Sequence, residues 1–198
     1  MNVAIRLLAV ATVLVGLAGC GEESEEEVEP PREAPHEVPD LPAGWTVSQN
    51  DSGGFALGVP PGWQAKRKGT ESVLKSGDRL AVVTVKPDRS NEALEADLAE
   101  LADATGVEFG NQFQEYRLGD TKKFRHRYEA YVASAEGTND GVRQEIDIYL
   151  LRRGELATFT VLAQLNSELG AAEYGPVVDA VVRTIRSRPP GGYSSRSG

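Results

Sequence analysis

The sequence predicts an α+β domain in which two main helices pack against an antiparallel sheet of about six strands. Three observations predict this fold class. Glycine-rich turn signals recur through the middle of the chain, apolar and polar residues alternate between these turns, and two segments instead repeat apolar residues at helical spacing. Because 40% of the 198 residues are hydrophobic, the chain can supply one such core.

The first strands are predicted where clusters of Gly, Asn, Asp and Ser separate apolar segments, as they do in β-hairpins. The predicted strand segments are 45–47, 55–59, 72–75 and 80–86, and the turn residues 50–54 and 76–78 divide them into two pairs. The basic run Lys66–Lys68 is predicted to lie on a solvated loop. Further reversals are expected at Gly119–Asp120, at Gly137–Gly141 and at Arg153–Gly154.

Alternation is clearest in the last strands, which are predicted at 124–132, at 142–151 and from Ala157 onward. A two-residue turn at Arg153–Gly154 would pair Leu150 with Ala157, Ile148 with Phe159 and Ile146 with Val161. In that register both apolar sets lie on one side of the sheet, as a single core requires. We therefore expect an antiparallel meander with one buried face.

Two segments are predicted to be helices. Ser90 or Asn91 caps a stretch that runs to about Asp103, and Pro176 opens the second helix. Their apolar stripes are Leu94, Leu98 and Leu101 in the first, and Val178, Val181, Val182 and Ile185 in the second.

The N-terminus predicts export and lipidation. A short apolar run follows a basic start and ends in small residues, which is typical of a signal peptide over residues 1–19. Leu17-Ala18-Gly19-Cys20 resembles the lipobox of bacterial lipoproteins at every position. The resemblance implies a diacylglyceryl group on the Cys20 sulfur, cleavage before Cys20 and often an added acyl chain such as palmitate. We therefore expect an extracytoplasmic protein that is lipid-anchored to the cell membrane through Cys20.

The charge of the chain is concentrated near this anchor. Residues 21–42 carry nine acidic residues and one basic residue, against a net charge of −9 for the whole chain. This Pro/Glu-rich stretch is predicted to be a disordered linker that follows Cys20 within residues 20–42, with a domain at 43–188 and a disordered tail at 189–198. The acidic balance excludes a nucleic-acid binder. One Cys and two His argue against a structural zinc site, and no metal or cofactor is expected.

A family resemblance covers about residues 43 to 188. Gly54–Trp63 looks like the opening hairpin of PsbP-like proteins, Arg117–Arg125 resembles their Gly turn leading into a strand, and Tyr174–Arg186 looks like their terminal helix. The resemblance implies an antiparallel sheet covered by helices. In this superfamily that fold serves protein docking, as in photosystem II extrinsic subunits and Ran-binding relatives. Actinobacterial lipoproteins of the LpqN type share it, and no common catalytic residues can be carried over.

Catalytic candidates are few. His126 is the only histidine of the predicted domain, and alternation places it on an apolar face between Phe124 and Tyr128. No nucleophile, carboxylate or second ligand is placed beside it, so a hydrogen-bonded structural histidine is the favoured interpretation. Glu145 and Asp147 resemble an acid pair, but cross-strand ion pairs with arginines explain them. We therefore expect no enzyme.

A mixed polar and aromatic sheet face is the candidate binding surface. It combines residue types favoured at interfaces, although a solvated half-exposed sheet would look the same. Trp63, after Pro60-Pro61-Gly62, is a second candidate that either lines a ligand cleft or forms a structural corner. The face consists of Arg125, Arg127, Tyr131, Arg143 and Tyr149.

Three functions compete at this level. The leading hypothesis is a non-catalytic envelope lipoprotein that docks another envelope protein. The alternative is a lipid or glycolipid carrier with an apolar cleft between helix and sheet near Trp63. The third is a hydrolase built on His126. The sequence does not decide between the first two, because both need a domain held near a membrane.

Overall fold

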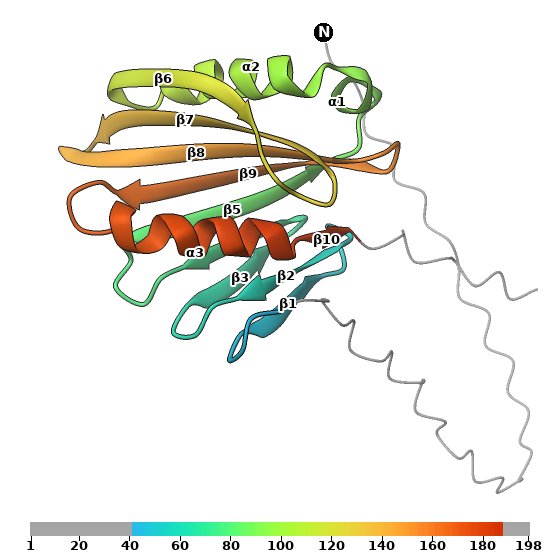
Figure 1. Ribbon diagram of the computed structural model, residues 1–198, viewed down its shortest axis with the longest axis horizontal. Coiled ribbons are helices and arrows are strands. Elements are labelled where there is room, and N and C mark those ends of the chain that lie inside the picture. The colour runs from blue at the N-terminus through green and yellow to red at the C-terminus, as the bar shows by residue number, and fades with distance from the viewer. Residues whose placement is uncertain (1–40, 188–198) are drawn as a thin grey trace, which may run out of the picture. The chain divides into compact units, whose positions relative to one another are not determined.

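The computed structural model describes residues 41–187, which form two antiparallel sheets and three helices (Figure 1). The large sheet has the order β3-β4-β5-β9-β8-β7-β6, and the small one β1-β2-β10. The helices are α1 (Asn91–Glu95), α2 (Leu98–Gly110) and α3 (Ala171–Thr184). The strands are β1 (Thr46–Asn50), β2 (Phe55–Val59), β3 (Gln64–Lys68), β4 (Glu71–Lys75), β5 (Ala81–Asp88), β6 (Gln114–Lys123), β7 (Glu129–Asn139), β8 (Val142–Arg153), β9 (Ala157–Asn166) and β10 (Arg186–Ser187).

The predicted fold class is confirmed, with seven strands in the large sheet rather than about six. The basic run Lys66–Lys68 is part of edge strand β3 and not a loop. Gly119–Asp120 is not a reversal either, because β6 continues through it with a shift in register against β7. The predicted reversal at Gly137–Gly141 is a tight turn between β7 and β8, where Asp140 and Gly141 both have positive φ.

The helices cover opposite faces of the large sheet. Helix α3 packs on β5 and β9 and also contacts β2, whereas α2 packs on β6, β7 and β8 (Figure 1). A hydrophobic cluster lies on each side. The α3-side cluster includes Val83, Phe159 and Val181, and the α2-side cluster includes Leu98, Ile146 and Ile148. The members described for both clusters lie within residues 41–187, and we expect a chain that starts at Leu41 to fold on its own.

The register predicted for the last two strands is wrong. Arg153 pairs with Ala157, so Ile148 lies opposite Leu162 and Leu150 opposite Thr160. Three residues, Gly154 to Leu156, form the turn, and Gly154 takes a positive φ of 48°. The register is therefore shifted by three residues from the predicted one. Because an odd shift exchanges the faces, Phe159 and Val161 lie in the α3-side cluster, while Ile146 and Ile148 lie in the α2-side cluster.

The strand predicted at 124–132 is also corrected. Residues 124–128 connect β6 to β7 without belonging to either strand, and β7 begins at Glu129. The predicted alternation of exposure nevertheless holds, since Phe124, His126 and Tyr128 are half-buried while Arg125 and Arg127 are exposed. The alternation in the sequence correctly indicated which side chains face the core, although residues 124–128 do not form a strand.

The first predicted helix is two helices. Ser90 caps α1 through a hydrogen bond from the Ala93 amide, and Asp97 caps α2 by accepting from the Ala99 and Glu100 amides. Helix α3 begins at Ala171, five residues before the expected start, and Pro176 lies exposed inside it. No helix within residues 41–187 is long and apolar enough to cross a membrane. The predicted signal peptide, Cys20, most of the linker and the tail 189–198 lie outside the described residues.

Candidate functional site

Two tryptophans are positioned by the same local turn. In Pro42–Trp45 and in Pro60–Trp63, the carbonyl of the proline accepts a hydrogen bond from the tryptophan amide, at 3.1 and 3.2 Å. The third residue of each turn is a glycine with positive φ, +82° at Gly44 and +78° at Gly62. This is the pattern of a type II β-turn, which needs a residue that tolerates positive φ at that position. The sequence Pro-x-Gly-Trp therefore places the backbone of both tryptophans in the same way.

The two turns lie together. A Cβ atom added at Gly44 would lie 3.6 Å from Pro61, in the second turn. The Trp45 ring occupies the space left free by Gly58 of β2, where an added Cβ would lie 2.9 Å from Trp45 Cε3. Both indole rings pack against the α3-side cluster while remaining partly exposed. Each ring is therefore anchored by the core and still partly exposed.

Tyr174 on α3 completes the aromatic group. Its ring contacts the Trp63 ring edge to face, with 5.7 Å between the centroids. Its hydroxyl donates a hydrogen bond to Asp78 Oδ2 at 2.7 Å. The other oxygen of Asp78 accepts from the Ser76 hydroxyl at 2.6 Å and from the Leu80 amide at 3.0 Å. The turn between β4 and β5 thus fixes the orientation of a ring on α3.

These hydrogen bonds set the protonation states of Asp78 and Tyr174. The hydrogen bond from Ser76, followed by those from the Leu80 amide and Tyr174, lowers the pKa of Asp78 below its usual value. The hydrogen bond to Asp78 raises the pKa of Tyr174 to about 12. At neutral pH, Asp78 is therefore ionised and Tyr174 is a neutral donor.

An open cleft of about 420 Å³ lies over these rings. We call it the aromatic cleft. It is bounded by the two turns, by the β4–β5 turn and by the first half of α3, so four segments distant in sequence meet there. Its lining residues are Trp45, Pro60, Pro61, Gly62, Trp63, Gly77, Asp78, Glu173, Tyr174 and Val177.

The chemistry of the aromatic cleft suits binding. Tryptophan and tyrosine supply large apolar area with few rotatable bonds, and they dominate the energetics of protein interfaces. Its two carboxylates, Asp78 and Glu173, add a negative charge at one side, and Asp78 is already occupied by three donors. Among residues 41–187, no group of three or more His, Cys, Asp or Glu side chains is arranged to hold a metal ion.

The structure does not bring the five residues of the predicted sheet face together. Arg125 and Arg127 are exposed on the segment between β6 and β7. Tyr131 on β7 packs against the α2-side cluster, and Tyr149 on β8 is only 2% exposed on the opposite side of the sheet. The Tyr149 hydroxyl donates to Asp179 on α3 at 2.7 Å, and burial raises the pKa of this phenol far above its usual range. The prediction of a single Arg/Tyr face is therefore wrong.

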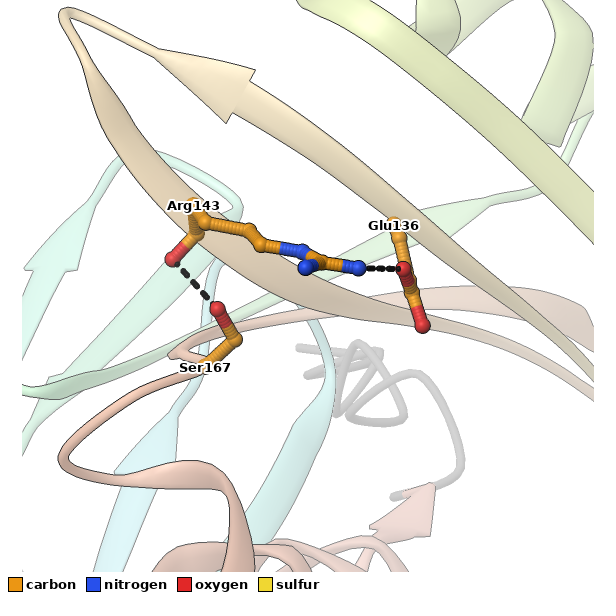
Figure 2. Close-up of polar contacts among 3 residues, drawn as sticks. All are labelled: Glu136, Arg143 and Ser167. Atoms are coloured by element: carbon orange, nitrogen blue, oxygen red, sulfur yellow. Dashed lines mark hydrogen bonds and ion pairs between the residues drawn. The ribbon is translucent and has the colours of Figure 1, made fainter.

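Arg143 lies near the β7–β8 turn, away from these residues. Figure 2 shows its guanidinium directed at Glu136 of β7, with 2.6 Å between Arg143 Nη2 and Glu136 Oε2. Its backbone carbonyl accepts from the Ser167 hydroxyl at 3.0 Å. The two charged side chains remain 60% and 51% exposed. An exposed pair of this kind contributes little to stability.

His126 is half-buried, and its Nε2 has no hydrogen-bond partner among residues 41–187. Its Nδ1 accepts a hydrogen bond from the Tyr128 amide at 3.1 Å, and its ring contacts the Tyr128 ring at 4.9 Å. Burial, with the charges of Arg186 and Arg127, lowers the pKa of His126 to about 4. The imidazole is therefore neutral at physiological pH.

Sequence reasoning found Trp63 but missed Trp45 and Tyr174. The repeat of Pro-x-Gly-Trp at 42–45 and 60–63 is the signal that would have paired the two tryptophans. No local pattern identifies Tyr174, because the contact depends on how α3 lies against the β2–β3 corner.

Comparison with solved structures identifies the fold. The Ran-binding protein Mog1p of Saccharomyces cerevisiae is 11% identical with a TM-score of 0.53, and the match covers 73% of this chain and 95% of that one. Cyanobacterial PsbP from Synechocystis is 13% identical with a TM-score of 0.53, covering 72% and 92%. LpqN of Mycobacterium tuberculosis, described as involved in cell envelope biogenesis, is 11% identical with a TM-score of 0.49, covering 74% and 86%.

The chain also spans about half the length, 49%, of a matching protein from Bacteroides thetaiotaomicron. No protein-family model matches the sequence, and no curated protein resembles it closely enough to count as a relative. At such low identities the structural likenesses establish the fold alone. That fold is PsbP/Mog1-like, as the sequence resemblance implied.

Proposed function

We propose, with the PsbP/Mog1-like fold as the premise, that this chain is a non-catalytic docking module of the cell envelope. Its aromatic cleft binds another envelope protein. The single observation that carries the proposal is the convergence of Trp45, Trp63 and Tyr174 on one open cleft, with each ring held on its inner side by the core. Preorganised aromatic rings of this kind are typical hot spots of protein interfaces.

The proposed location in the cell envelope rests on the N-terminal sequence. Leu17–Cys20 supports a lipid anchor at Cys20, which would hold the domain outside the cytoplasmic membrane. Replacing Cys20 with serine should move the protein from the membrane fraction to the soluble extracytoplasmic fraction and abolish labelling by palmitate. Unchanged fractionation of Cys20→Ser would contradict the anchor without affecting the aromatic cleft.

The docking role can be tested by cross-linking in intact cells. A photoreactive amino acid at Glu173 would lie on the rim of the aromatic cleft, and one at Glu100 is the matched control. Both residues are exposed glutamates in the first turn of a helix, but their helices cover opposite faces of the sheet. We expect one reproducible envelope protein cross-linked from Glu173 and not from Glu100. No adduct from Glu173, or the same adducts from both positions, would contradict the proposal.

A second candidate shares the same cleft. Two indole rings beside one opening also suit the sugar of a glycolipid, because aromatic rings present a large apolar surface with a polar N–H at its edge. The space between α3 and the sheet is filled by fully buried side chains such as Val178, Val181 and Val182, which leaves acyl chains no room there. A stoichiometric glycolipid in the organic extract of the native protein would favour this candidate over protein docking.

A further inference from the structure

A second cleft lies at the opposite end of the sheet from β6 and has a different chemistry. It has a volume of about 570 Å³, and it is lined by residues of β3, β4 and the β4–β5 turn. We call it the basic cleft. Its lining residues are Gln64, Lys66, Arg67, Lys68, Val73, Lys75 and Arg79. Five of these seven side chains are cationic, and none is acidic.

Strand pairing gathers these cations. Lys66 lies opposite Val73 and Gln64 lies opposite Lys75 in the β3–β4 ladder, so their side chains share one face. Arg79 approaches from the turn that follows β4. Within residues 41–187, no side-chain hydrogen bond or ion pair joins these five cations to a carboxylate. Glu71 is not a lining residue, but it lies opposite Lys68 on the same face. The cations that matter for a ligand are therefore Lys66, Lys75 and Arg79, and not Lys68.

Edge protection explains only part of this pattern. Lysines on an exposed edge strand prevent pairing with another chain, and every residue of β3 is exposed. Lys75 lies on the next strand inward and Arg79 in a turn, where neither protects an edge. Arg79 also has a positive φ of 66°, a conformation that glycine or asparagine adopts at lower cost. The convergence of these two side chains with Lys66 therefore needs another explanation.

We propose that the basic cleft binds the phosphate groups of anionic phospholipids at a membrane surface. Lysine and arginine side chains that no protein carboxylate neutralises attract phosphate oxygens through charge and hydrogen bonds. An edge strand that is exposed along its whole length can approach an extended surface. The chain as a whole carries a net charge of −9, so such binding depends on this local cluster and not on overall charge.

Vesicle sedimentation tests the proposal. The chain from Leu41 onward is mixed with phosphatidylcholine vesicles, with or without phosphatidylglycerol, at low salt. We expect binding only when phosphatidylglycerol is present, and weaker binding as salt increases. Replacing Lys66, Lys75 and Arg79 together with glutamine should lower the partition coefficient roughly 100-fold, because each cation near an anionic surface contributes about fivefold.

A matched variant controls for net charge. Lys122 and Lys123 are exposed on β6, the other edge strand, and Arg125 is exposed on the segment that follows it. Replacing these three with glutamine should leave binding unchanged. Equal losses in the two triple variants would overturn the proposal, as would equal binding to both kinds of vesicle. Circular dichroism of both variants excludes unfolding as the cause of a loss.

Two further experiments identify which kind of anionic ligand the basic cleft binds. Inorganic phosphate added at constant ionic strength should not displace the protein from vesicles at millimolar concentration. Displacement would overturn the proposal of a lipid ligand and would favour a free phosphate ligand. Tighter binding of a poly-glutamate peptide than of the vesicles would overturn it in favour of an acidic protein partner. None of these outcomes bears on cross-linking from Glu173, so the two proposals fail separately.

Discussion

The aromatic cleft and the end of the β7–β8 hairpin both carry residue types found at binding sites, but they are built differently. In the aromatic cleft, the rings of Trp45, Trp63 and Tyr174 pack against the α3-side cluster on one side. At the hairpin, Glu136 and Arg143 form an ion pair with each other, and both side chains are more than half exposed. Residue type alone therefore does not define a binding site, because anchoring by the core decides which side chains are preorganised.

The largest expected difference between the two regions is in stability. Trp63→Ala should lower the free energy of unfolding by about 2–3 kcal/mol, because a partly buried ring that packs on the core and on Tyr174 is lost. Arg143→Ala should change it by less than about 0.5 kcal/mol, as for other exposed ion pairs. Urea denaturation measures both. Equal effects would mean that the cleft is no better anchored than the hairpin.

A substitution in the turn that precedes Trp63 should have a smaller effect on stability, and we predict its sign. An alanine Cβ at Gly62 would meet no atom within 4 Å, so Gly62→Ala tests backbone strain at φ +78° alone. We expect a loss of about 1 kcal/mol. Gly175→Ala is the control, because Gly175 lies inside α3 with equally open space and no positive φ. We expect it to change stability by less than about 0.5 kcal/mol, because the gain in helix propensity is offset by the contact of the added Cβ with the following Pro176. Thermal unfolding that shows equal losses for both would contradict the turn assignment.

Loss of the hydrogen bond between Tyr174 and Asp78 should have the smallest effect, a change in the Tyr174 pKa that absorbance spectroscopy can follow. The phenol should titrate at about 12 in the native protein. In Asp78→Asn the negative acceptor is gone, so the Tyr174 pKa should fall toward 10.0. Since the folded pKa lies above the unfolded one, this bond adds stability at neutral pH that is lost as pH rises from 10 to 12. Absorbance titration with Tyr174→Phe as the blank measures the shift. An unchanged titration would show that Asp78 does not hold the ring.

The sequence predicted local features well and long-range ones poorly. The glycine turns other than Gly119–Asp120, the Ser90 cap, the fold class and the inward face of 124–128 follow from local rules, and the structure agrees with them. The β8–β9 register failed because a two-residue turn was assumed where Gly154–Leu156 makes a three-residue one. The Arg/Tyr face failed because the β7–β8 register pairs Tyr131 with Leu150, which puts Tyr131 and Tyr149 on opposite sides of the sheet. Trp63 was found from its turn, whereas Tyr174 depends on tertiary packing.

The central claim is that the aromatic cleft, and not the hairpin, is the docking site. The most direct measurement compares the yield of the adduct cross-linked from Glu173 in the native protein, in Trp63→Phe and in Arg143→Ala. Phenylalanine keeps a ring to pack on the core but removes much of the indole. We predict at least a tenfold loss of adduct for Trp63→Phe, as expected for roughly 1.4 kcal/mol at a hot spot, and no change for Arg143→Ala. An unchanged yield in Trp63→Phe, or a loss in Arg143→Ala alone, would contradict the claim.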